Sequence, residues 1–413
     1  MALKKIFLHV GHGKTGSSYA QSSLALSRSE LSKYDISYPI SGRTESEAMK
    51  GYISSGNFNP NKENLSQFLA EKCQEIGTNL LISNEGLFVP EIHNDFLCQL
   101  KKNFPDTAIE ILLFIRNPYE HAQSLYQQIV KRSGYVGSFD EYLCSLNSNR
   151  LILVKRFIKI AKEYNANLTI KNYSRCKDFI LNCFEDWLGV KKGTLVVPPV
   201  KNVNRSLTLS ELYLQKSFNY HLSDKYKSSR FISDELCNKI PELKSEKPVA
   251  SANAKSFFYK RIESDLKKLN SLLPESEKYL FSEDHIDMDQ DEIEFPDSYT
   301  FNKKQIDIIA HSISREIIRL NELSKVEKIK TLLAFSERDI AHNNYDDATV
   351  CCNKAKNILK ELEFVNQSII NLENVINNQL RQISIANRLI RIRFFTRVKH
   401  YVKKILNHLK EKL

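Results

Sequence analysis

The sequence lacks long apolar runs and the cysteine spacings that mark metal-binding or disulfide-rich proteins. No stretch of about 18 consecutive apolar residues occurs, so we expect no helix that spans a membrane. The eight cysteines form no C-x-x-C pair and show no regular spacing, which argues against a zinc site and against a disulfide framework. The sequence therefore predicts reduced thiols in a cytosol and no metal site.

The N-terminal apolar run is too short to predict a secretion signal. It extends only from Ile6 to Val10 and leads into a glycine-rich loop, whereas the apolar core of a signal peptide is longer. The run therefore predicts a β-strand, and we expect a cytoplasmic protein.

The net charge of +11 is concentrated at the C-terminus. The last 28 residues, from Ala386, contain nine Lys or Arg and one acid, so +8 of the net charge lies there and the rest of the chain is close to neutral. Since no nucleic-acid-binding motif accompanies this charge, we expect no nucleic-acid partner.

The first half of the chain alternates short apolar runs with helical patterns, which is typical of an α/β fold with a parallel sheet. A helix pattern from Thr15 to about Lys33 follows the first run, and another directly follows the third. In such a sheet, ligands lie where the strands end. The predicted strands are residues 4–10, 79–83, 109–115 and 167–171.

The second half becomes helical. The acidic run at 283–294 predicts a solvated loop, and the helical spacing over 301–324 predicts a helix that closes the first domain. Beyond about Val326 the chain has neither Gly nor Pro, which predicts an all-α extension. We therefore expect an α/β domain over 1–325 and a helical extension over 326–413. Within the extension, a plain helical hairpin is favoured over a tetratricopeptide-like one, for which Tyr345, Ala348 and Ala355 would be suitably placed.

The loop after the first strand has the composition of an anion site. It reads VGHGKTGSSYAQSSL over residues 10–24, so a strand leads through glycines and hydroxyl residues into a helix. A Walker A loop would place lysine directly after Gly16, but Ser17 fills that position and Lys14 lies inside the loop. Backbone N–H groups and the helix dipole at such a turn favour phosphate or sulfate. The residues predicted to bind the anion are Gly11, Gly13, Lys14, Thr15, Gly16, Ser17 and Ser18.

A second candidate anion site follows the third strand. Asn117 predicts a helix N-cap, with Pro118 and Glu120 in the first turn. Arg116 then stands at the end of the strand, and Ser124 lies about two turns into the helix. Together they could bind a second phosphate, although an arginine in a salt bridge and an ordinary helical serine explain the pattern as well.

These two motifs together resemble the sulfotransferase family that uses 3′-phosphoadenosine 5′-phosphosulfate as donor. In that family a K-T-G-[TS]-[TS] loop, here residues 14–18, binds the 5′-phosphosulfate, and an Arg followed eight residues later by a Ser, here Arg116 and Ser124, binds the 3′-phosphate. The resemblance covers roughly residues 1–325. It implies a P-loop-type sheet, no metal, Lys14 at the oxygen that bridges phosphate and sulfate, and adenosine 3′,5′-bisphosphate as the product.

Further stretches are similar to the bacterial and carbohydrate-directed branch of the family. The R-K-G-x-x-G-x-W signature of the small-molecule enzymes is absent, and 191–193 hold only a fragment of it. The resemblance therefore implies that the acceptor is a hydroxyl or amine of a glycan or glycolipid. The similar stretches are 36–40, 80–88, 172–189 and 202–219.

A base must take the proton of the acceptor. Glu85, just after the second strand, is the best candidate because the family uses a Glu or His, but it could equally anchor its loop. His12 is either a contact to sulfate or an exposed loop histidine, and His9 is predicted in the core. Asn204 and Arg205 could reach an anion, although a surface turn is favoured.

Two other functions remain open from the sequence. A P-loop kinase is disfavoured by the missing lysine after Gly16 and by the lack of a convincing magnesium-binding Asp. A non-catalytic nucleotide-binding or scaffold protein is the other alternative.

The basic C-terminal segment, residues 385–413, has apolar residues at three- and four-residue steps. It predicts an amphipathic helix that either packs on its own domain or binds an anionic membrane surface peripherally. The apolar positions are Ile385, Leu389, Ile392, Phe395, Val398, Val402, Ile405 and Leu409, and the basic flanks include Arg388, Arg391, Lys399, Lys403 and Lys410.

Overall fold

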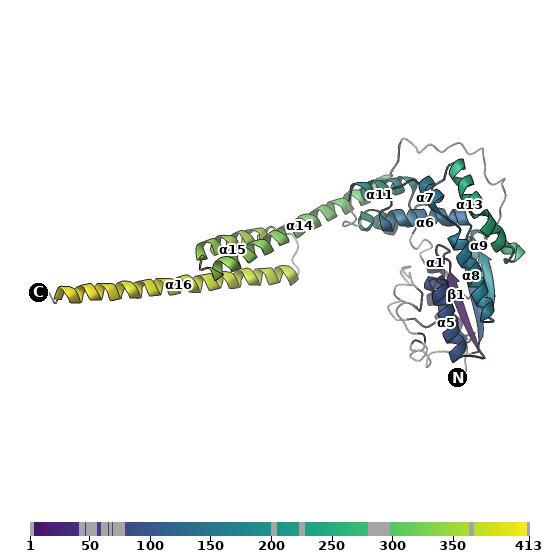
Figure 1. Cartoon of the computed structure of the whole chain (residues 1–413), viewed down its shortest axis with the longest axis horizontal. Helices are drawn as coiled ribbons and strands as arrows, with labels where there is room; N and C mark the ends of the chain where they lie inside the picture. Colours follow the sequence, from purple (N-terminus) through teal and green to yellow (C-terminus); the bar gives the residue numbers. More distant parts are fainter. Residues whose placement is uncertain are drawn as a thin grey trace. The chain divides into compact units, whose positions relative to one another are not determined.

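A computed structural model describes the fold of the chain. The residues that it describes are 4–40, 46, 56–58, 65, 68, 79–199, 205–222, 228–279, 298–362 and 367–410. They divide into two compact units, residues 1–309 and 310–413, which we call the α/β unit and the helical unit (Figure 1). The sequence predicted a boundary between residues 325 and 326. The acidic run at 283–294 lies outside the described residues.

The α/β unit contains a five-stranded sheet in which every pair of strands is parallel, in the order β2-β3-β1-β4-β5. The α/β fold with a parallel central sheet is thereby confirmed. The two-residue strand β2 was missed, because two residues are too few to show an alternating pattern. The strands are β1 (Lys5–Gly11), β2 (Ile36–Ser37), β3 (Asn79–Ser83), β4 (Ala108–Ile115) and β5 (Asn167–Asn172).

Strand β1 lies between β3 and β4 and is paired with both along most of its length. Leu8 is opposite Ile82 on one side and Ile111 on the other. On one side of β1 lie β3 and then β2, and on the other side lie β4 and then β5. The strand order therefore reverses direction at β1. Ligands bind at such a reversal point in open α/β sheets, beyond the carboxyl ends of the strands.

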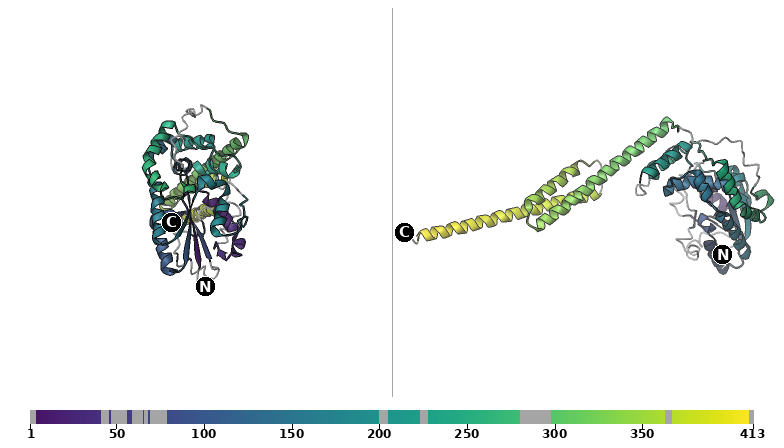
Figure 2. Two further views of the ribbon diagram at one scale, coloured as in Figure 1. Left: turned by 90° about the vertical axis from the view of Figure 1, so that its right-hand side faces the viewer. Right: turned by 45° about the horizontal axis from the view of Figure 1, so that its top comes forward.

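Helices cover both faces of the sheet (Figure 2). Alternate residues of β1 enter different cores: Ile6 and Leu8 pack in a core with residues of α5, α6 and α8, whereas Phe7 packs in another with residues of α1 and α10. The helices of this unit are α1 (Ser17–Leu26), α2 (Arg28–Ser32), α5 (Pro90–Asn103), α6 (Pro118–Ser133), α7 (Phe139–Ser145), α8 (Asn149–Glu163), α9 (Tyr173–Cys176), α10 (Ile180–Leu188), α11 (Leu209–His221), α12 (Ser233–Lys239) and α13 (Ala252–Asn270). Short 3-10 helices are η1 (Glu85–Phe88), η2 (Lys177–Phe179), η4 (Ser228–Arg230) and η5 (Glu275–Glu277).

The helix predicted from Thr15 to Lys33 is wrong as a single element, because it is interrupted at Ser27 between α1 and α2. The Ser27 hydroxyl accepts a hydrogen bond from Val196 N at 2.7 Å, and the Ser23 hydroxyl donates to Val196 O at the same distance. The later segment therefore binds where the two helices meet, which no pattern within 15–33 could indicate.

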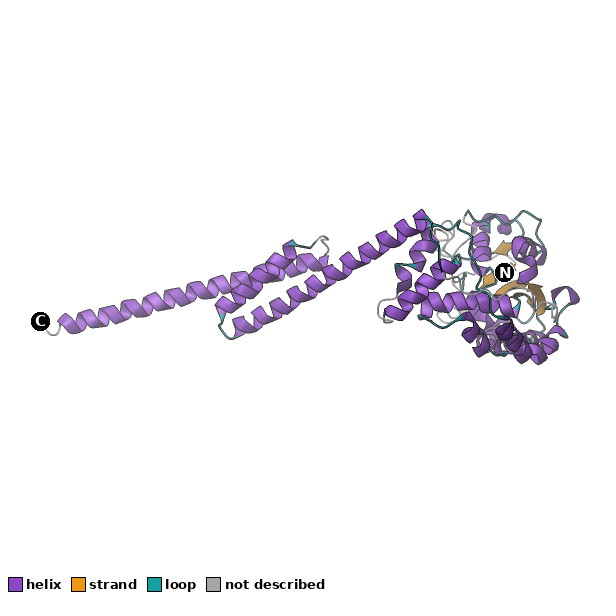
Figure 3. Cartoon of the chain, turned by 90° about the horizontal axis from the view of Figure 1, so that it is seen from above, coloured by secondary structure: helices purple, strands orange, loops and turns teal. Residues whose placement is uncertain are grey.

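In the described residues, the helical unit consists of most of α14 (Lys303–Ala341), together with α15 (Tyr345–Lys360) and α16 (Gln367–Lys410) (Figure 3). A helical C-terminal region is thereby confirmed. The predicted end of a helix at residue 324 is wrong, because α14 continues to bury Ile329 and Leu333 against Ala355 and Ile376. A second small core contains Ala348, Cys352 and Ile383. Among the described helices, none is both long and apolar enough to cross a bilayer.

Candidate functional site

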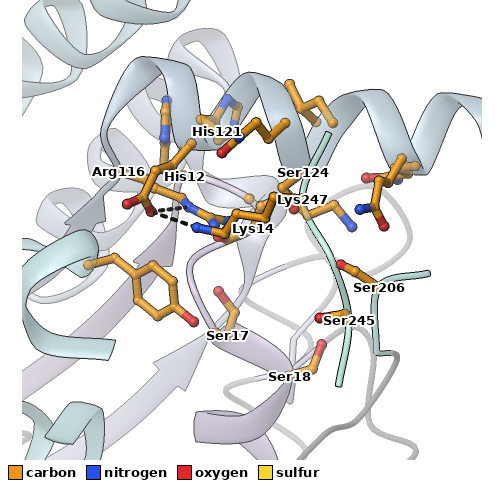
Figure 4. Close-up of a pocket in the computed structure, with 18 of the residues that line it drawn as sticks. His12, Lys14, Ser17, Ser18, Arg116, His121, Ser124, Ser206, Ser245 and Lys247 are labelled. Atoms are coloured by element: carbon orange, nitrogen blue, oxygen red, sulfur yellow. Dashed lines mark hydrogen bonds and ion pairs between the residues drawn. The ribbon is translucent and has the colours of Figure 1, made fainter. Parts of the chain in front are cut away.

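A cavity of about 840 Å³ opens where the central strands end (Figure 4). It is lined by the loop after β1, by η1 after β3, by Arg116 directly after β4 and by one face of α6. Gly11 and Thr15 do not line the cavity; the Thr15 side chain is fully buried and its hydroxyl has no hydrogen-bond partner among the described residues. The predicted residues that do line it are His12, Gly13, Lys14, Gly16, Ser17, Ser18, Glu85, Arg116, Ser124 and Arg205.

The loop after β1 is folded too tightly for side chains at two of its glycines. A Cβ at Gly11 would lie 2.4 Å from Ser17 Oγ and 2.9 Å from Glu85 Cγ, so Gly11 allows the loop and η1 to approach each other. Gly16 has a φ of 75°, and a Cβ there would lie 3.0 Å from Tyr173. These glycines let the backbone reach the cavity wall.

Lys14 itself has a left-handed backbone, with a φ of 60°, which is uncommon for a residue with a side chain. A long-range contact supports this conformation: Arg116 Nη1 donates a hydrogen bond to Lys14 O at 2.8 Å. The strained residue is therefore held in place from the neighbouring strand, as is common at functional sites.

Helix α1 begins at Ser17 with no side chain to cap it. Its N-cap is Gly16, and no side-chain hydrogen bond is made to the first turn. The first N–H groups of a helix have no partner within the helix, and here Ser17 and Ser18 line the cavity. This helix end can therefore bind an anion through its backbone.

Lys14 and Glu85 influence each other's ionisation. Burial lowers the pKa of Lys14, as do the nearby charges of Lys131 and Arg116, whereas Glu85 raises it. Burial raises the pKa of Glu85 above its usual range, whereas the Ser17 hydroxyl and Lys14 lower it. The cavity thus contains a cation and a carboxyl group that both lie in a poorly solvated setting.

The alternative role for Glu85, as a group that caps its own loop, is filled by its neighbour Asn84. The Asn84 side chain accepts a hydrogen bond from Gly86 N and donates one to Phe58 O, each at 2.5 Å. Glu85 is the first residue of η1 and lines the cavity.

Arg116 is both a cavity residue and a member of a salt bridge. As predicted, Asn117 caps α6, where its side chain accepts from the N–H groups of the first turn at 3.0 and 3.2 Å. Arg116 Nε lies 3.5 Å from Glu120 Oε2, and the guanidinium lies 5.5 Å from the centre of the Tyr173 ring. Ser124 is half-buried on the same face of α6 as Glu120.

Of the two alternatives for His12, that of an exposed loop histidine is wrong. His12 is 4% exposed, neither of its ring nitrogens has a hydrogen-bond partner among the described residues, and its ring lies 4.7 Å from that of His121. Burial, reinforced by Arg150, lowers the pKa of His12 to about 3. Burial also lowers the pKa of His121 to about 2. Both rings are therefore neutral near pH 7 and offer hydrogen-bonding atoms to a ligand.

The structure also shows the surroundings of His9 and Arg205. His9 is buried as predicted, with its Nδ1 atom 2.7 Å from Ser83 Oγ. Arg205 does not lie in a surface turn: it is 5% exposed and forms two hydrogen bonds with the Glu211 carboxylate, at 2.7 and 2.8 Å. The charge of Arg205 is thus neutralised within the fold. Asn204 lies outside the described residues.

Among the His, Lys and Arg side chains that line the cavity, the sequence patterns did not predict five: His121, Lys131, Arg132, Arg150 and Lys247. A helical signal existed for the first two, since positions 121 and 131 lie three and seven residues from Ser124, on the helix face that lines the cavity. No local signal existed for Lys247, because it meets α6 across more than a hundred residues of chain.

The cavity is suited to an anionic ligand. Its lining includes seven Lys or Arg side chains, of which Arg205 is paired with Glu211 and Arg132 with Asp234, but only two Glu. Its volume lies within the range of about 300–1,000 Å³ that small-molecule sites occupy. Comparisons with protein-family models, with curated proteins and with solved structures found no match for this chain.

Proposed function

We propose that the chain is a sulfotransferase whose α/β unit has a P-loop-type fold. It moves a sulfuryl group from 3′-phosphoadenosine 5′-phosphosulfate to a hydroxyl or amine of a glycan or glycolipid. One observation carries the proposal: the loop with Lys14, the carboxyl group of Glu85 and the Arg116–Ser124 pair line a single cavity at the carboxyl ends of β1, β3 and β4.

The 5′-phosphosulfate would bind at the loop and the uncapped start of α1. The backbone there approaches the cavity closely, and Ser17 and Ser18 add hydroxyl groups. Lys14 lies within the loop instead of after Gly16, so it can approach the first phosphate and its bridging oxygen. The absence of a lysine after Gly16 makes a kinase that transfers the γ-phosphate of ATP the weaker alternative.

In the proposed reaction, these residues would act as follows. The acceptor oxygen attacks sulfur in line with the oxygen that bridges sulfur and phosphorus; the bond to the bridging oxygen breaks, and adenosine 3′,5′-bisphosphate leaves. Lys14 neutralises the charge that develops on the leaving oxygen. Glu85 takes the proton of the acceptor, and its raised pKa brings it closer to the value that suits a base at neutral pH.

The nature of the acceptor rests on the resemblance to the carbohydrate-directed branch. The neutral His12 and His121 rings offer hydrogen-bonding atoms to hydroxyl groups without adding charge. A polar acceptor such as a sugar fits these groups better than a steroid or phenol.

Transfer of labelled sulfate from the donor to a panel of glycans and lipid-linked precursors tests the proposal directly. A simpler test compares two ligands by thermal shift. Adenosine 3′,5′-bisphosphate at 100 times its dissociation constant should stabilise the protein by about 2.7 kcal/mol. A larger shift with ATP and magnesium would favour the kinase, and no shift with either would favour a role without nucleotide.

A further inference from the structure

Residues 245–250 form a segment without helix or strand that crosses α6 beside the cavity. We call it the strap. Two buried glutamines of α6 hold it: Gln123 donates to Pro248 O at 2.8 Å, and Gln127 donates to Glu246 O at 2.6 Å. Ala250 N donates to the Tyr119 hydroxyl at 2.9 Å. These bonds fix the strap at three points on one helix.

The fixed backbone places alternate side chains in the cavity. The carbonyl groups of Glu246 and Pro248 accept from α6, whereas the side chains of Ser245 and Lys247 line the cavity (Figure 4). Ser124 and Ser206 contribute further hydroxyl groups to the same lining. A cavity wall that carries both a cation and hydroxyl groups is a suitable environment for a phosphate.

Lys247 and Arg116 share one counter-ion. Glu120 Oε2 lies 3.8 Å from Lys247 Nζ and 3.5 Å from Arg116 Nε, and Ser174 Oγ donates to the same oxygen at 3.2 Å. Both ion pairs are longer than the 2.7–2.9 Å or so of a strong charge-assisted hydrogen bond. The single carboxylate therefore satisfies neither cation fully, so a dianion near them would be favoured.

The two cations differ in how firmly the fold holds them. The Arg116 side chain is 12% exposed and is also bonded to Lys14 O and packed over Tyr173. The Lys247 side chain is 50% exposed, and a lysine ammonium on its flexible stem can turn toward a ligand. Lys247 can therefore reach an incoming group at a smaller structural cost than Arg116.

We propose that Lys247 is the specificity-determining cation that binds the second phosphate monoester of the nucleotide, and that Arg116 is a positioning residue that ties the Lys14 loop to α6. The inference rests on the proposed function, and it separates two roles that the sequence assigned jointly to Arg116 and Ser124. The ligand class is a nucleoside bisphosphate whose second phosphate is a dianion.

Calorimetric titration of the full chain with adenosine 3′,5′-bisphosphate and with adenosine 5′-phosphate tests the inference. Lys247→Ala should weaken the bisphosphate by about tenfold or more and change the monophosphate little, so the preference for the bisphosphate falls. Lys247→Arg should restore most of the preference. Lys244→Ala removes an exposed charge that does not line the cavity, and should leave both dissociation constants unchanged.

Arg116→Ala should weaken both nucleotides to a similar extent, because the loop that holds the 5′-group loses its brace. Circular dichroism of each variant checks that it is folded. If Lys247→Ala leaves the preference unchanged while Arg116→Ala abolishes it, the inference is overturned and the proposed function stands. If the unaltered protein binds neither nucleotide, the proposed function itself is contradicted.

Discussion

The two units of the molecule bury different kinds of side chain. The α/β unit buries histidines, hydroxyl groups and the Arg205–Glu211 ion pair alongside its apolar cores. The helical unit buries small apolar clusters such as Ile329, Leu333 and Ala355, with few polar side chains among them (Ser312, Ser336 and Asp339), and leaves large apolar side chains of α16 exposed. Burial of polar groups opposes folding unless they are bonded, so their concentration around the cavity points to a ligand and not to stability alone.

The same difference distinguishes the unit that we expect to bind the ligand from the segment that we expect to bind a membrane surface. A site needs groups that the fold holds in place before the ligand arrives, and the α/β unit supplies these through contacts between distant segments, such as Arg116 with Lys14 O. The exposed part of α16 contains apolar and basic residues that are not buried in the described structure. Such a surface is suited to binding a membrane or another molecule. We therefore expect substitutions in the cavity, acid and truncation of α16 to affect the two units differently.

The largest effect is expected from Lys14→Ala, which should abolish transfer, with a loss of about 10³-fold or more in kcat/KM. Alanine makes the same demand on the left-handed backbone as lysine, so the loop and both units should remain folded. Initial rates with labelled donor measure the loss, and thermal unfolding measures the fold. Lys162→Ala, an exposed change on α8, is the control. Retention of most of the activity would remove the central claim.

Glu85→Gln should lower kcat by about 10²-fold with little change in donor affinity, because a general base acts on the acceptor. Since the base must be deprotonated, the rate of the unaltered enzyme should fall as the pH drops through the raised pKa of Glu85. This dependence should flatten in the variant. Glu91→Gln, at an exposed salt bridge on α5, is the control. If Glu85→Gln leaves the pH profile of the steady-state rate unchanged, the general base is His12 or another group.

Acid should unfold the α/β unit before the helical unit. Burial lowers the pKa of His9, His12 and His93 to about 3 and that of His121 to about 2. The unfolded chain binds protons at these residues below about pH 6.5, whereas the folded chain does not. Stability is therefore lost as the pH falls from about 6 toward 3, by about 1.4 kcal/mol per pH unit for each histidine.

The single tryptophan makes this unfolding measurable by unit. Trp187 packs against Phe7 at 5.2 Å and Phe184 at 6.0 Å, so its fluorescence reports on the α/β unit, whereas far-ultraviolet circular dichroism reports on helices in both. The described histidines of the helical unit, such as His311 and His342, are exposed. As the pH is lowered, we expect the fluorescence of Trp187 to change at a higher pH than the pH at which the remaining helical circular dichroism signal is lost. If the fluorescence and circular dichroism transitions coincide, the buried histidines do not make the α/β unit more sensitive to acid than the helical unit.

Much of the fold followed from local patterns. The strand at 79–83 and the Asn117 cap were predicted at the correct residues, because alternation and capping depend on neighbours in the sequence. The loop residues that line the cavity were found for the same reason. The break at Ser27 and the continuation of α14 past residue 324 were not, because they depend on contacts with distant segments.

The electrostatics of the site lay beyond the sequence for a similar reason. Burial of His12 and its contact with His121 follow from packing of the loop against α6, and a motif does not encode that packing. Lys247 enters the cavity only because Gln123 and Gln127 bind the strap. Residues such as Lys247, which a distant segment brings to the cavity, can therefore be predicted only when the fold is known.

The smallest effect on turnover is expected from deletion of residues 386–413, which tests the helical unit alone. The cut lies beyond Ile383, the last residue of α16 in the packed cores, so the truncated unit should stay folded. In the described part of the segment the exposed apolar side chains include Ile390 and Phe394 as well as Leu389 and Phe395, so apolar groups lie around the helix and not on one predicted face.

Basic residues interleave with these apolar groups, and none of the described side chains from 384 to 400 is buried. Near an anionic bilayer each basic residue contributes about 1 kcal/mol, while the apolar groups enter the headgroup region. The full chain should therefore bind vesicles that contain anionic lipid, less so at high salt, and the truncated chain should not. Turnover on a soluble acceptor should be nearly unchanged. Vesicles of neutral lipid are the control, and sedimentation at several protein concentrations identifies the alternative in which a second copy of α16 covers the segment. Equal vesicle binding by both chains, or loss of the unfolding transition on truncation, would show that the segment serves packing instead of anchoring.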